Sequence, residues 1–261
     1  MSVSSTVDFG MEGLGMVEAG IDDLVTSSKY VLATIALDMS GSVCSFQDLI
    51  QTMSIEAIRA LQRDSNANSM LVRVISFGGH GVQEVHPWAL LKDIDVSEST
   101  VNQRGTIYHS LIANGGTPCH EAISNSRSEA RRKSAELRDN GYDVAIVENI
   151  ITDGEDTTAG YSGGPTFQDL AQILTDIQQD EAAESYIGYL LGINVSRCRQ
   201  SLEDLSAGAK FTEFLDEENY DKESLAKIFG YVVSSISTAS ANVGSGQSSP
   251  MNSATSSAIV I

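Results

Sequence analysis

YVLATIALD, at residues 30–38, is a run of mostly apolar side chains that ends in Asp38. A short run of this kind is typical of a β-strand that is buried on both faces of a sheet. From Phe46 to Leu61, apolar residues then recur at helical spacing. A buried strand followed by an amphipathic helix is the unit from which parallel sheets are built.

The same alternation continues to residue 237. We expect further strands at residues 70–77, 82–88, 143–152, 186–193 and 210–215, and helices at residues 117–137, 166–179, 201–205 and 225–236. Pro87 favours an edge position for the 82–88 strand, because proline cannot donate a ladder hydrogen bond. The pattern predicts an α/β fold with a single Rossmann-like domain, in which helices cover both faces of a mostly parallel sheet with one antiparallel edge strand.

Composition divides the chain into three parts. Residues 1–28 form an acidic N-terminal arm, and residues 29–237 form the predicted domain. Residues 238–261 are rich in Ser, Ala, Gly and Asn and carry no charged side chain. Such a segment buries too little apolar area to offset its ordering entropy, so we expect a flexible tail.

Charge and hydropathy exclude several classes of protein. The 261 residues include 35 acidic and 16 basic side chains, which gives a formal charge of −19. Nonspecific binding of nucleic acid needs clustered Lys and Arg, and anionic membranes repel a protein of this charge. No apolar stretch is long enough to span a bilayer. We therefore expect neither a nucleic-acid nor a membrane partner.

Cysteine usage and the N-terminus indicate a cytoplasmic protein. The three cysteines, Cys44, Cys119 and Cys198, contain no CxxC pair and resemble neither a disulfide framework nor a zinc site. The first residues lack the basic and apolar regions of a secretory signal. A reducing compartment is the simplest expectation.

Three oxygen-rich clusters follow predicted strands or lie in a loop. They are Asp38-Met39-Ser40-Gly41-Ser42, Gly115-Gly116-Thr117-Pro118 and Asp153-Gly154-Glu155-Asp156. In a parallel sheet, ligands bind beyond the carboxyl ends of the strands, so the clusters should meet at one edge. Carboxylates and hydroxyls are hard ligands that suit Mg²⁺, with Mn²⁺ as a substitute.

The three clusters together resemble the metal-ion-dependent adhesion site of the von Willebrand factor A domain. That family has an Asp-x-Ser-x-Ser motif, then a distant Thr and a distant Asp, which match Asp38, Ser40, Ser42, Thr117 and Asp153. The resemblance covers residues 28–237. It implies that the two serines and Thr117 contact the metal directly, that the two aspartates act through water, and that an Asp or Glu of a protein partner completes the coordination.

Each motif alone has a simpler interpretation. Asp, Ser and Gly after a strand are common turn residues, and Thr117-Pro118 is typical of a helix N-cap followed by its first residue. We expect Glu155 and Asp156 to be solvated loop charges. His80, in a Gly-rich turn, is either a solvent-facing loop residue or a partner contact. The basic run at residues 127–138 is either a solvated helix face or a docking surface for an acidic partner.

The expected function is a non-enzymatic, metal-dependent protein–protein interaction module, such as an adaptor or subunit of an intracellular assembly. Two alternatives remain, a scaffold with a purely structural metal and a metal-dependent phosphate-ester hydrolase. For the hydrolase, Ser40 occupies the position at which a haloacid-dehalogenase-type phosphatase has its general acid. Within the family the chain looks like the intracellular bacterial or phage type, including proteins linked to tellurium resistance. Acidic residues of the N-terminal arm suggest possible self-association through the metal site.

Overall fold

The computed structural model describes residues 28–96, 111–158, 163–179, 183 and 185–245. Its strands are β1 (Lys29–Met39), β2 (Met70–Gly78), β3 (Gly81–Leu90), β4 (Asp143–Thr152), β5 (Ser185–Ile193) and β6 (Glu213–Glu217). Its helices are α1 (Gln47–Gln62), α3 (Cys119–Asp139), α4 (Phe167–Gln179), α5 (Arg199–Gly208) and α6 (Lys222–Ser245), and a short 3₁₀ helix, η2 (Gly41–Ser45), precedes α1. The predicted N-terminal arm lies outside the described residues, apart from Ser28.

The six strands form one sheet in the order β3-β2-β1-β4-β5-β6. All neighbouring pairs are parallel except β2 and β3, which form an antiparallel hairpin. Strand β3, which contains Pro87, lies at the edge of the sheet. The sequence prediction of a mostly parallel α/β sheet with one antiparallel edge strand is therefore confirmed.

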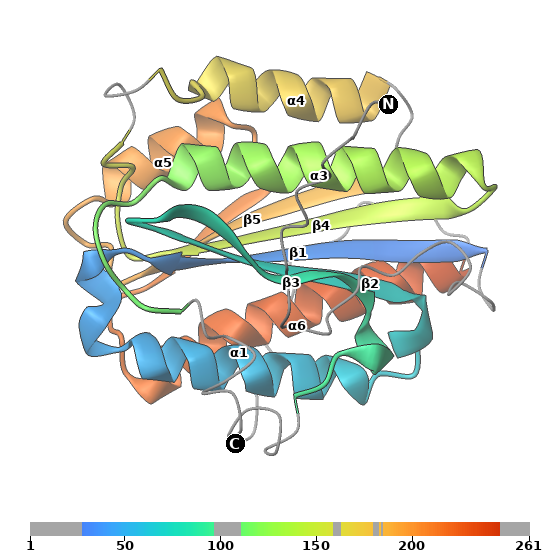
Figure 1. Cartoon of the computed structure of the whole chain (residues 1–261), viewed down its shortest axis with the longest axis horizontal. Helices are drawn as coiled ribbons and strands as arrows, with labels where there is room; N and C mark the ends of the chain where they lie inside the picture. Colours follow the sequence, from blue (N-terminus) through green and yellow to red (C-terminus); the bar gives the residue numbers. More distant parts are fainter. Residues whose placement is uncertain (1–27, 97–110, 159–162, 180–182, 184, 246–261) are drawn as a thin grey trace, which may run out of the picture.

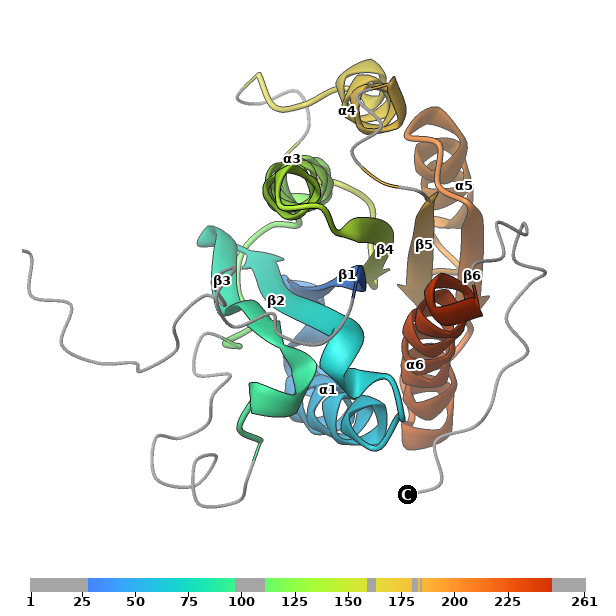
Figure 2. The ribbon, with the colours of Figure 1, turned by 90° about the vertical axis from the view of Figure 1, so that its right-hand side faces the viewer.

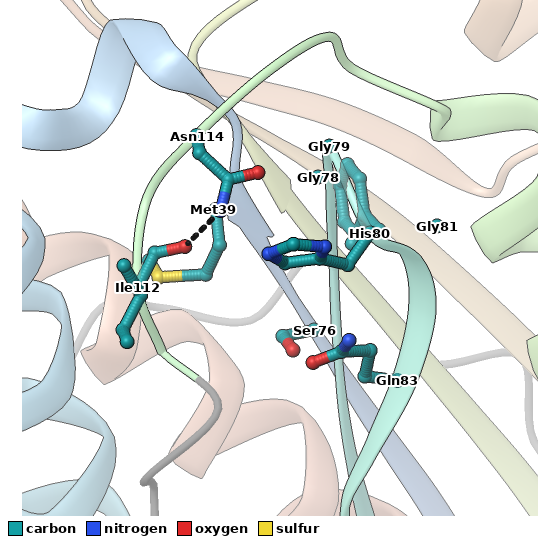
Figure 3. A pocket seen from close by; sticks show the side chains of 10 residues that line it. Met39, Ser76, Gly78, Gly79, His80, Gly81, Gln83, Ile112 and Asn114 are labelled. Atoms are coloured by element: carbon teal, nitrogen blue, oxygen red, sulfur yellow. Dashed lines mark hydrogen bonds between the residues drawn. The ribbon is translucent and has the colours of Figure 1, made fainter.

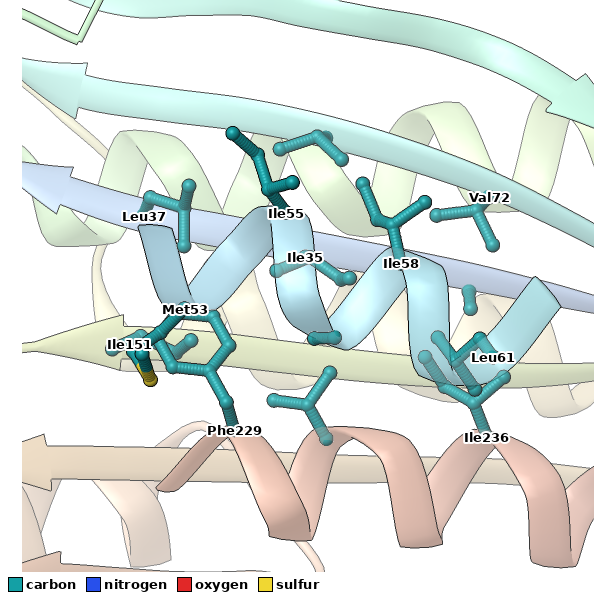
Figure 4. Close-up of a cluster of buried hydrophobic side chains, with 14 of the residues drawn as sticks. Ile35, Leu37, Met53, Ile55, Ile58, Leu61, Val72, Ile151, Phe229 and Ile236 are labelled. Carbon is teal, nitrogen blue, oxygen red and sulfur yellow. The ribbon is translucent and has the colours of Figure 1, made fainter. Parts of the chain in front are cut away.

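Helices cover both faces of this sheet (Figures 1 and 2). α1 and α6 pack on one face and contact each other, while α3, α4 and α5 lie on the other. On the α1 and α6 face, Ile35, Met53 and Phe229 belong to one buried cluster, in which strand and helix side chains interdigitate (Figure 4). Burial on both faces explains why β1 is almost entirely apolar.

The α3 face contains a buried ion pair. Arg127 Nε donates to Glu148 Oε2 over 3.1 Å, and neither side chain is more than 1% exposed. The Arg127 Nη1 group also donates to the carbonyl oxygens of Leu170 and Ala209. A single guanidinium thus joins α3 to β4, to α4 and to the end of α5, and Tyr186 donates its hydroxyl to Glu148 as well.

The basic run at residues 127–138 is a solvated helix face only in part, because Arg127 and Lys133 are buried whereas Arg132 is exposed. Lys133 is buried, and its ammonium lies 3.3 Å from Glu136 Oε1. Arg131 pairs with Asp176 of α4, and Arg132 pairs with Glu129 within α3. These four cations are thus paired with carboxylates of the same chain, which lowers the positive charge that they offer to an acidic partner.

Helix α6 extends to Ser245, past the boundary that the sequence predicted at residue 237. The cause is packing, since Ala239 belongs to the core cluster and Ser240 is buried. Alanine is also the best helix former, so a segment rich in small residues continues the helix where its inner face is covered. None of the described helices, α6 included, combines the length and hydropathy of a membrane crossing.

Candidate metal centre

The three oxygen-rich segments meet at the edge of the sheet where the parallel strands end, on the left in Figure 1. Strand β1 pairs with β2 on one side and with β4 on the other, so the chain reverses its order across the sheet at this point. Ligands of open α/β sheets bind at such a switch point. Asp38 is the second-last residue of β1 and Asp153 directly follows β4.

Asp38 is buried and held by two hydrogen bonds. Its Oδ1 atom accepts from the backbone N–H of Ser40 over 2.8 Å, and its Oδ2 atom accepts from Thr152 Oγ1 over 2.6 Å. The register of β1 on β4, which pairs Leu37 with Ile151, brings Asp38 beside Thr152. Thr152, which we did not predict as part of the site, therefore fixes the orientation of this carboxylate.

A chain of hydrogen bonds links both serines to the second aspartate. Ser40 Oγ and Ser42 Oγ lie 2.9 Å apart, and Ser42 Oγ donates to Asp153 Oδ1 over 2.7 Å. Ser40 is buried, Ser42 is exposed and Asp153 is partly buried. Side chains that lie more than one hundred residues apart in the sequence thus converge at one surface-accessible point.

The loop that carries Thr117 is fastened to the same edge through its backbone. The N–H of Gly41 donates to the carbonyl oxygen of Gly115 over 3.0 Å, and that of Asn114 donates to Met39 over 3.0 Å. Gly115 has a positive φ of 62°, and a Cβ atom there would lie 2.4 Å from Gly79 Cα. Glycine is therefore required for the loop to approach β1 and the hairpin this closely.

A second clamp joins the Thr117 loop to the segment after β4. Thr117 donates its N–H to Thr157 Oγ1 over 2.8 Å, and the backbone carbonyl oxygen of Thr117 accepts from the Thr157 N–H over 3.2 Å. Asp156 accepts from the N–H of His120 through Oδ2 and from the N–H of Thr158 through Oδ1. The loops after β4 and before α3 are thereby held as one unit.

These contacts correct two interpretations from the sequence. Asp156 is not a solvated loop charge, since its side chain is 4% exposed and holds the first turn of α3. Thr117 is not the N-cap of that helix, because Pro118 occupies this position and no side-chain cap bond is made from it. The buried Thr117 side chain therefore has no capping role that would account for it.

When no cation is bound, burial disfavours the ionised carboxylates of Asp38 and Asp153, and the charge of Asp153 adds to the effect on Asp38. Burial raises the pKa of Asp38 from 3.8 to about 6; its hydrogen bonds from Thr152 and Ser40 oppose the rise, and the neighbouring Asp153 adds to it. Burial also raises the pKa of Asp153, against the hydrogen bond from Ser42. A bound cation would compensate both charges, as metal ions do at carboxylate sites.

The chemistry of the donors decides which ion fits. Among the residues described, no group of three or more His, Cys, Asp or Glu side chains is placed to hold a metal. The assembled donors are two carboxylates and the hydroxyls of two serines, and the Thr117 loop lies beside them. All are hard oxygen ligands, and this set fits Mg²⁺ or Mn²⁺ better than zinc or copper.

Cys119 and His120, which follow Thr117, do not form a nucleophile and base. The Cys119 side chain is fully buried, and burial raises its thiol pKa well above the ordinary value. His120 Nδ1 lies 2.9 Å from the carbonyl oxygen of Pro165, and its ring packs against Phe167. A reactive cysteine needs a lowered pKa and exposure, so this pair is part of the packing around α3.

Comparisons with known proteins identify the fold through structure alone. No family model matches the chain, and no curated protein matches it in sequence. The pilus adhesin SpaC from Lactobacillus rhamnosus GG, in its open conformation, is similar with a TM-score of 0.52 and 14% identity over 84% of this chain and 31% of that chain. Proximal thread matrix protein 1 from the mussel byssus is similar with a TM-score of 0.53 and 13% identity over 79% of this chain and 47% of that chain.

A solved VWA domain, that of SpRpn10, matches with a TM-score of 0.49 and 9% identity over 77% of this chain and 94% of that chain. The present chain spans less than half the length of SpaC and of the byssus protein. At such low identity, the likeness to those two proteins concerns the fold, an α/β sheet covered by helices.

Proposed function

We propose that the chain is a von Willebrand factor A domain that binds a protein partner through a divalent metal ion. The observation that carries this proposal is the hydrogen-bonded chain Ser40–Ser42–Asp153 beside the buried Asp38, at the switch point of the sheet. Its members are the motif residues that the family resemblance implies. One of the structurally similar proteins, SpaC, is a pilus adhesin, which is consistent with an interaction role.

The five site residues would hold the ion in two different ways. Ser40, Ser42 and Thr117 would bind the ion directly through neutral hydroxyls, and Asp38 and Asp153 would hold its water ligands. Mg²⁺ or Mn²⁺, when bound, offers an open coordination position to an Asp or Glu carboxylate of the partner. Neutral direct ligands leave the positive charge of the ion largely uncompensated, which favours an anionic partner group.

We also propose that the module has no catalytic activity and acts in the cytoplasm. Ser40 takes the place of the acid that a phosphatase of this layout would use, and the thiol beside Thr117 is buried. A purely structural metal would be expected to lie among closed protein ligands, whereas Ser42 is exposed at the surface. Phosphate esters should therefore show no turnover with Mg²⁺ that depends on Asp38.

The test is affinity purification from the native cells with three baits, the wild type, Ser40→Ala and Ser45→Ala. Ser45 is the last residue of η2, the 3₁₀ helix that Ser40 precedes as N-cap, and it is exposed, so its substitution controls for the loss of a hydroxyl. We expect a partner that is retained by the wild type and Ser45→Ala in Mg²⁺, and that EDTA or Ser40→Ala releases. Partners that are retained by all three baits in EDTA would contradict the proposal.

A further inference from the structure

A surface lined by residues that include no carboxylate lies beside the metal centre, on the side of the β2–β3 hairpin. A hollow of about 10 Å³ opens there between the hairpin and the 112–114 segment. His80, Gln83 and Asn114 surround it, with Ile112 at its rim (Figure 3). None of the described residues that line it is acidic, although the chain has 35 acidic side chains.

This surface is continuous with the candidate metal centre. Met39, which lines the hollow, accepts from the N–H of Asn114, and Asn114 in turn accepts from the N–H of Gly79 over 2.8 Å. The N–H of Gly41, between the two site serines, donates to Gly115. A group bound at the metal centre is therefore next to this surface, and backbone contacts hold the two together.

The opposite side of the centre is acidic. There the segment after β4 carries the exposed Glu155, whose carboxylate accepts from Ser201, and Asp153 itself. On the hairpin side, Glu84 is neutralised by Arg73, whose guanidinium lies 2.7 Å from it. An acidic segment that approaches the centre is therefore repelled by the exposed carboxylate of Glu155 on the β4 side, and at contact distance screening by salt is weak.

Ile112 adds an apolar contact to the hairpin side. Its side chain is 62% exposed, and Tyr220 is the only other large apolar side chain with comparable exposure among the described residues. The hollow itself holds about one water molecule, so it fits a methyl or hydroxyl group and excludes a ring. The surface thus suits a small side chain in the hollow and an apolar side chain on Ile112.

We infer that the partner segment runs from the metal centre across the β2–β3 hairpin, and that the residue next to its metal-binding Asp or Glu is Ala, Ser or Thr. This inference rests on the proposed function and adds the direction and the neighbouring residues of the bound segment. The partner is an extended acidic protein segment, because the cation attracts such a segment and the carboxylate of Glu155 repels it from the β4 side.

The test uses a displayed library of short peptides with a fixed central Asp, selected on the full chain in Mg²⁺ and eluted with EDTA. We expect enrichment of Ala, Ser or Thr beside the Asp. Binding of the selected peptides is then measured on the wild type, on Ile112→Glu, and on Gln200→Glu as the control, which adds the same charge at an exposed position of α5. Ile112→Glu should weaken binding about tenfold, and Gln200→Glu less than twofold.

Mn²⁺ titration of the same three proteins separates the possible failures. We expect equal Mn²⁺ affinity in all three. Equal peptide binding by all three, or a greater loss in Gln200→Glu, would overturn the inferred direction and leave the proposed function intact. Loss of Mn²⁺ affinity in Ile112→Glu would also overturn it, since the variant would then act on the metal site. A library that yields no Mg²⁺-dependent peptide would overturn the proposed function itself.

Discussion

At the scale of single residues, Asp38 carries the main electrostatic cost of the site. Its pKa is raised to about 6 in the folded chain, so the folded protein holds this proton more tightly than the unfolded chain does. Ionisation of Asp38 therefore lowers the stability of the metal-free protein. The cost is absent below about pH 4, grows between the two pKa values and is fully present above about pH 6.

We expect Asp38→Asn to stabilise the metal-free protein at pH 7.5 by on the order of 2–3 kcal/mol, and to change little at pH 4. The amide can keep both contacts, since its oxygen can accept from Ser40 N–H and its nitrogen can donate to Thr152 Oγ1, which itself donates to Gly154. Urea unfolding in EDTA at the two pH values measures the difference. Equal destabilisation at both would show that Asp38 is a purely structural acceptor.

At the scale of elements, the clamp between the Thr117 loop and residues 156–158 is expected to place the Thr117 hydroxyl. Asp156→Asn leaves one acceptor oxygen for the N–H groups of His120 and Thr158, because the amide nitrogen cannot accept a hydrogen bond. Groups that orient metal ligands typically contribute about 10- to 100-fold to affinity. We therefore expect Mn²⁺ affinity to fall by at least about tenfold in this variant.

The matched control is Glu155→Gln, which removes the same charge from the neighbouring exposed residue. This variant should bind Mn²⁺ with an affinity within about twofold of that of the wild type, since exposed charges interact weakly through solvent. Calorimetric titration of the two variants side by side distinguishes positioning from simple charge. An equal loss of Mn²⁺ affinity in Asp156→Asn and Glu155→Gln would mean that both carboxylates affect the metal only through their charge.

The sequence predicted the strands and helices well wherever the apolar residues follow a clear strand or helix period. The apolar run at residues 30–38 became β1, and Pro87 correctly indicated an edge strand. The end of α6 was missed, because Ala239 and Ser240 resemble tail residues until the core that covers them is known. Four of the five predicted site residues meet through their side chains or at the end of β1, and the fifth, Thr117, is brought to the same edge by its loop.

The partners that hold the site could not be predicted in the same way. Thr152 orients Asp38 only because of the register between β1 and β4, and Asp156 accepts from the first turn of a helix that begins far from it in the sequence. Such contacts depend on tertiary structure and leave no local period. For Thr152, the one available signal was a hydroxyl at the end of a predicted strand beside Asp153.

At the scale of the whole molecule, the Arg127–Glu148 pair joins the layers on the α3 face. Arg127→Met should destabilise the protein by about 3–5 kcal/mol, because it leaves the Glu148 carboxylate buried without its cation. The double variant Arg127→Met/Glu148→Leu should recover much of this loss, since well-packed apolar pairs often replace buried ion pairs at little cost. Chemical denaturation of the three proteins measures both steps.

A double variant as unstable as Arg127→Met would instead assign the stability to the contacts of Arg127 with the carbonyl oxygens of Leu170 and Ala209. Either way, Mn²⁺ affinity should be unchanged in variants that remain folded, because the pair lies beneath α3 and away from the edge where the strands end. This separates the stability of the fold from the chemistry of the site.

The proposed function depends most on the ability of the edge of the sheet to bind one hard divalent cation. Calorimetric titration of the wild type and of Ser40→Ala/Ser42→Ala with Mn²⁺ tests this directly. We predict a single site in the wild type that is lost in the double variant while the fold, followed by circular dichroism, is retained. Absence of binding in the wild type, or equal binding in the double variant, would contradict the account.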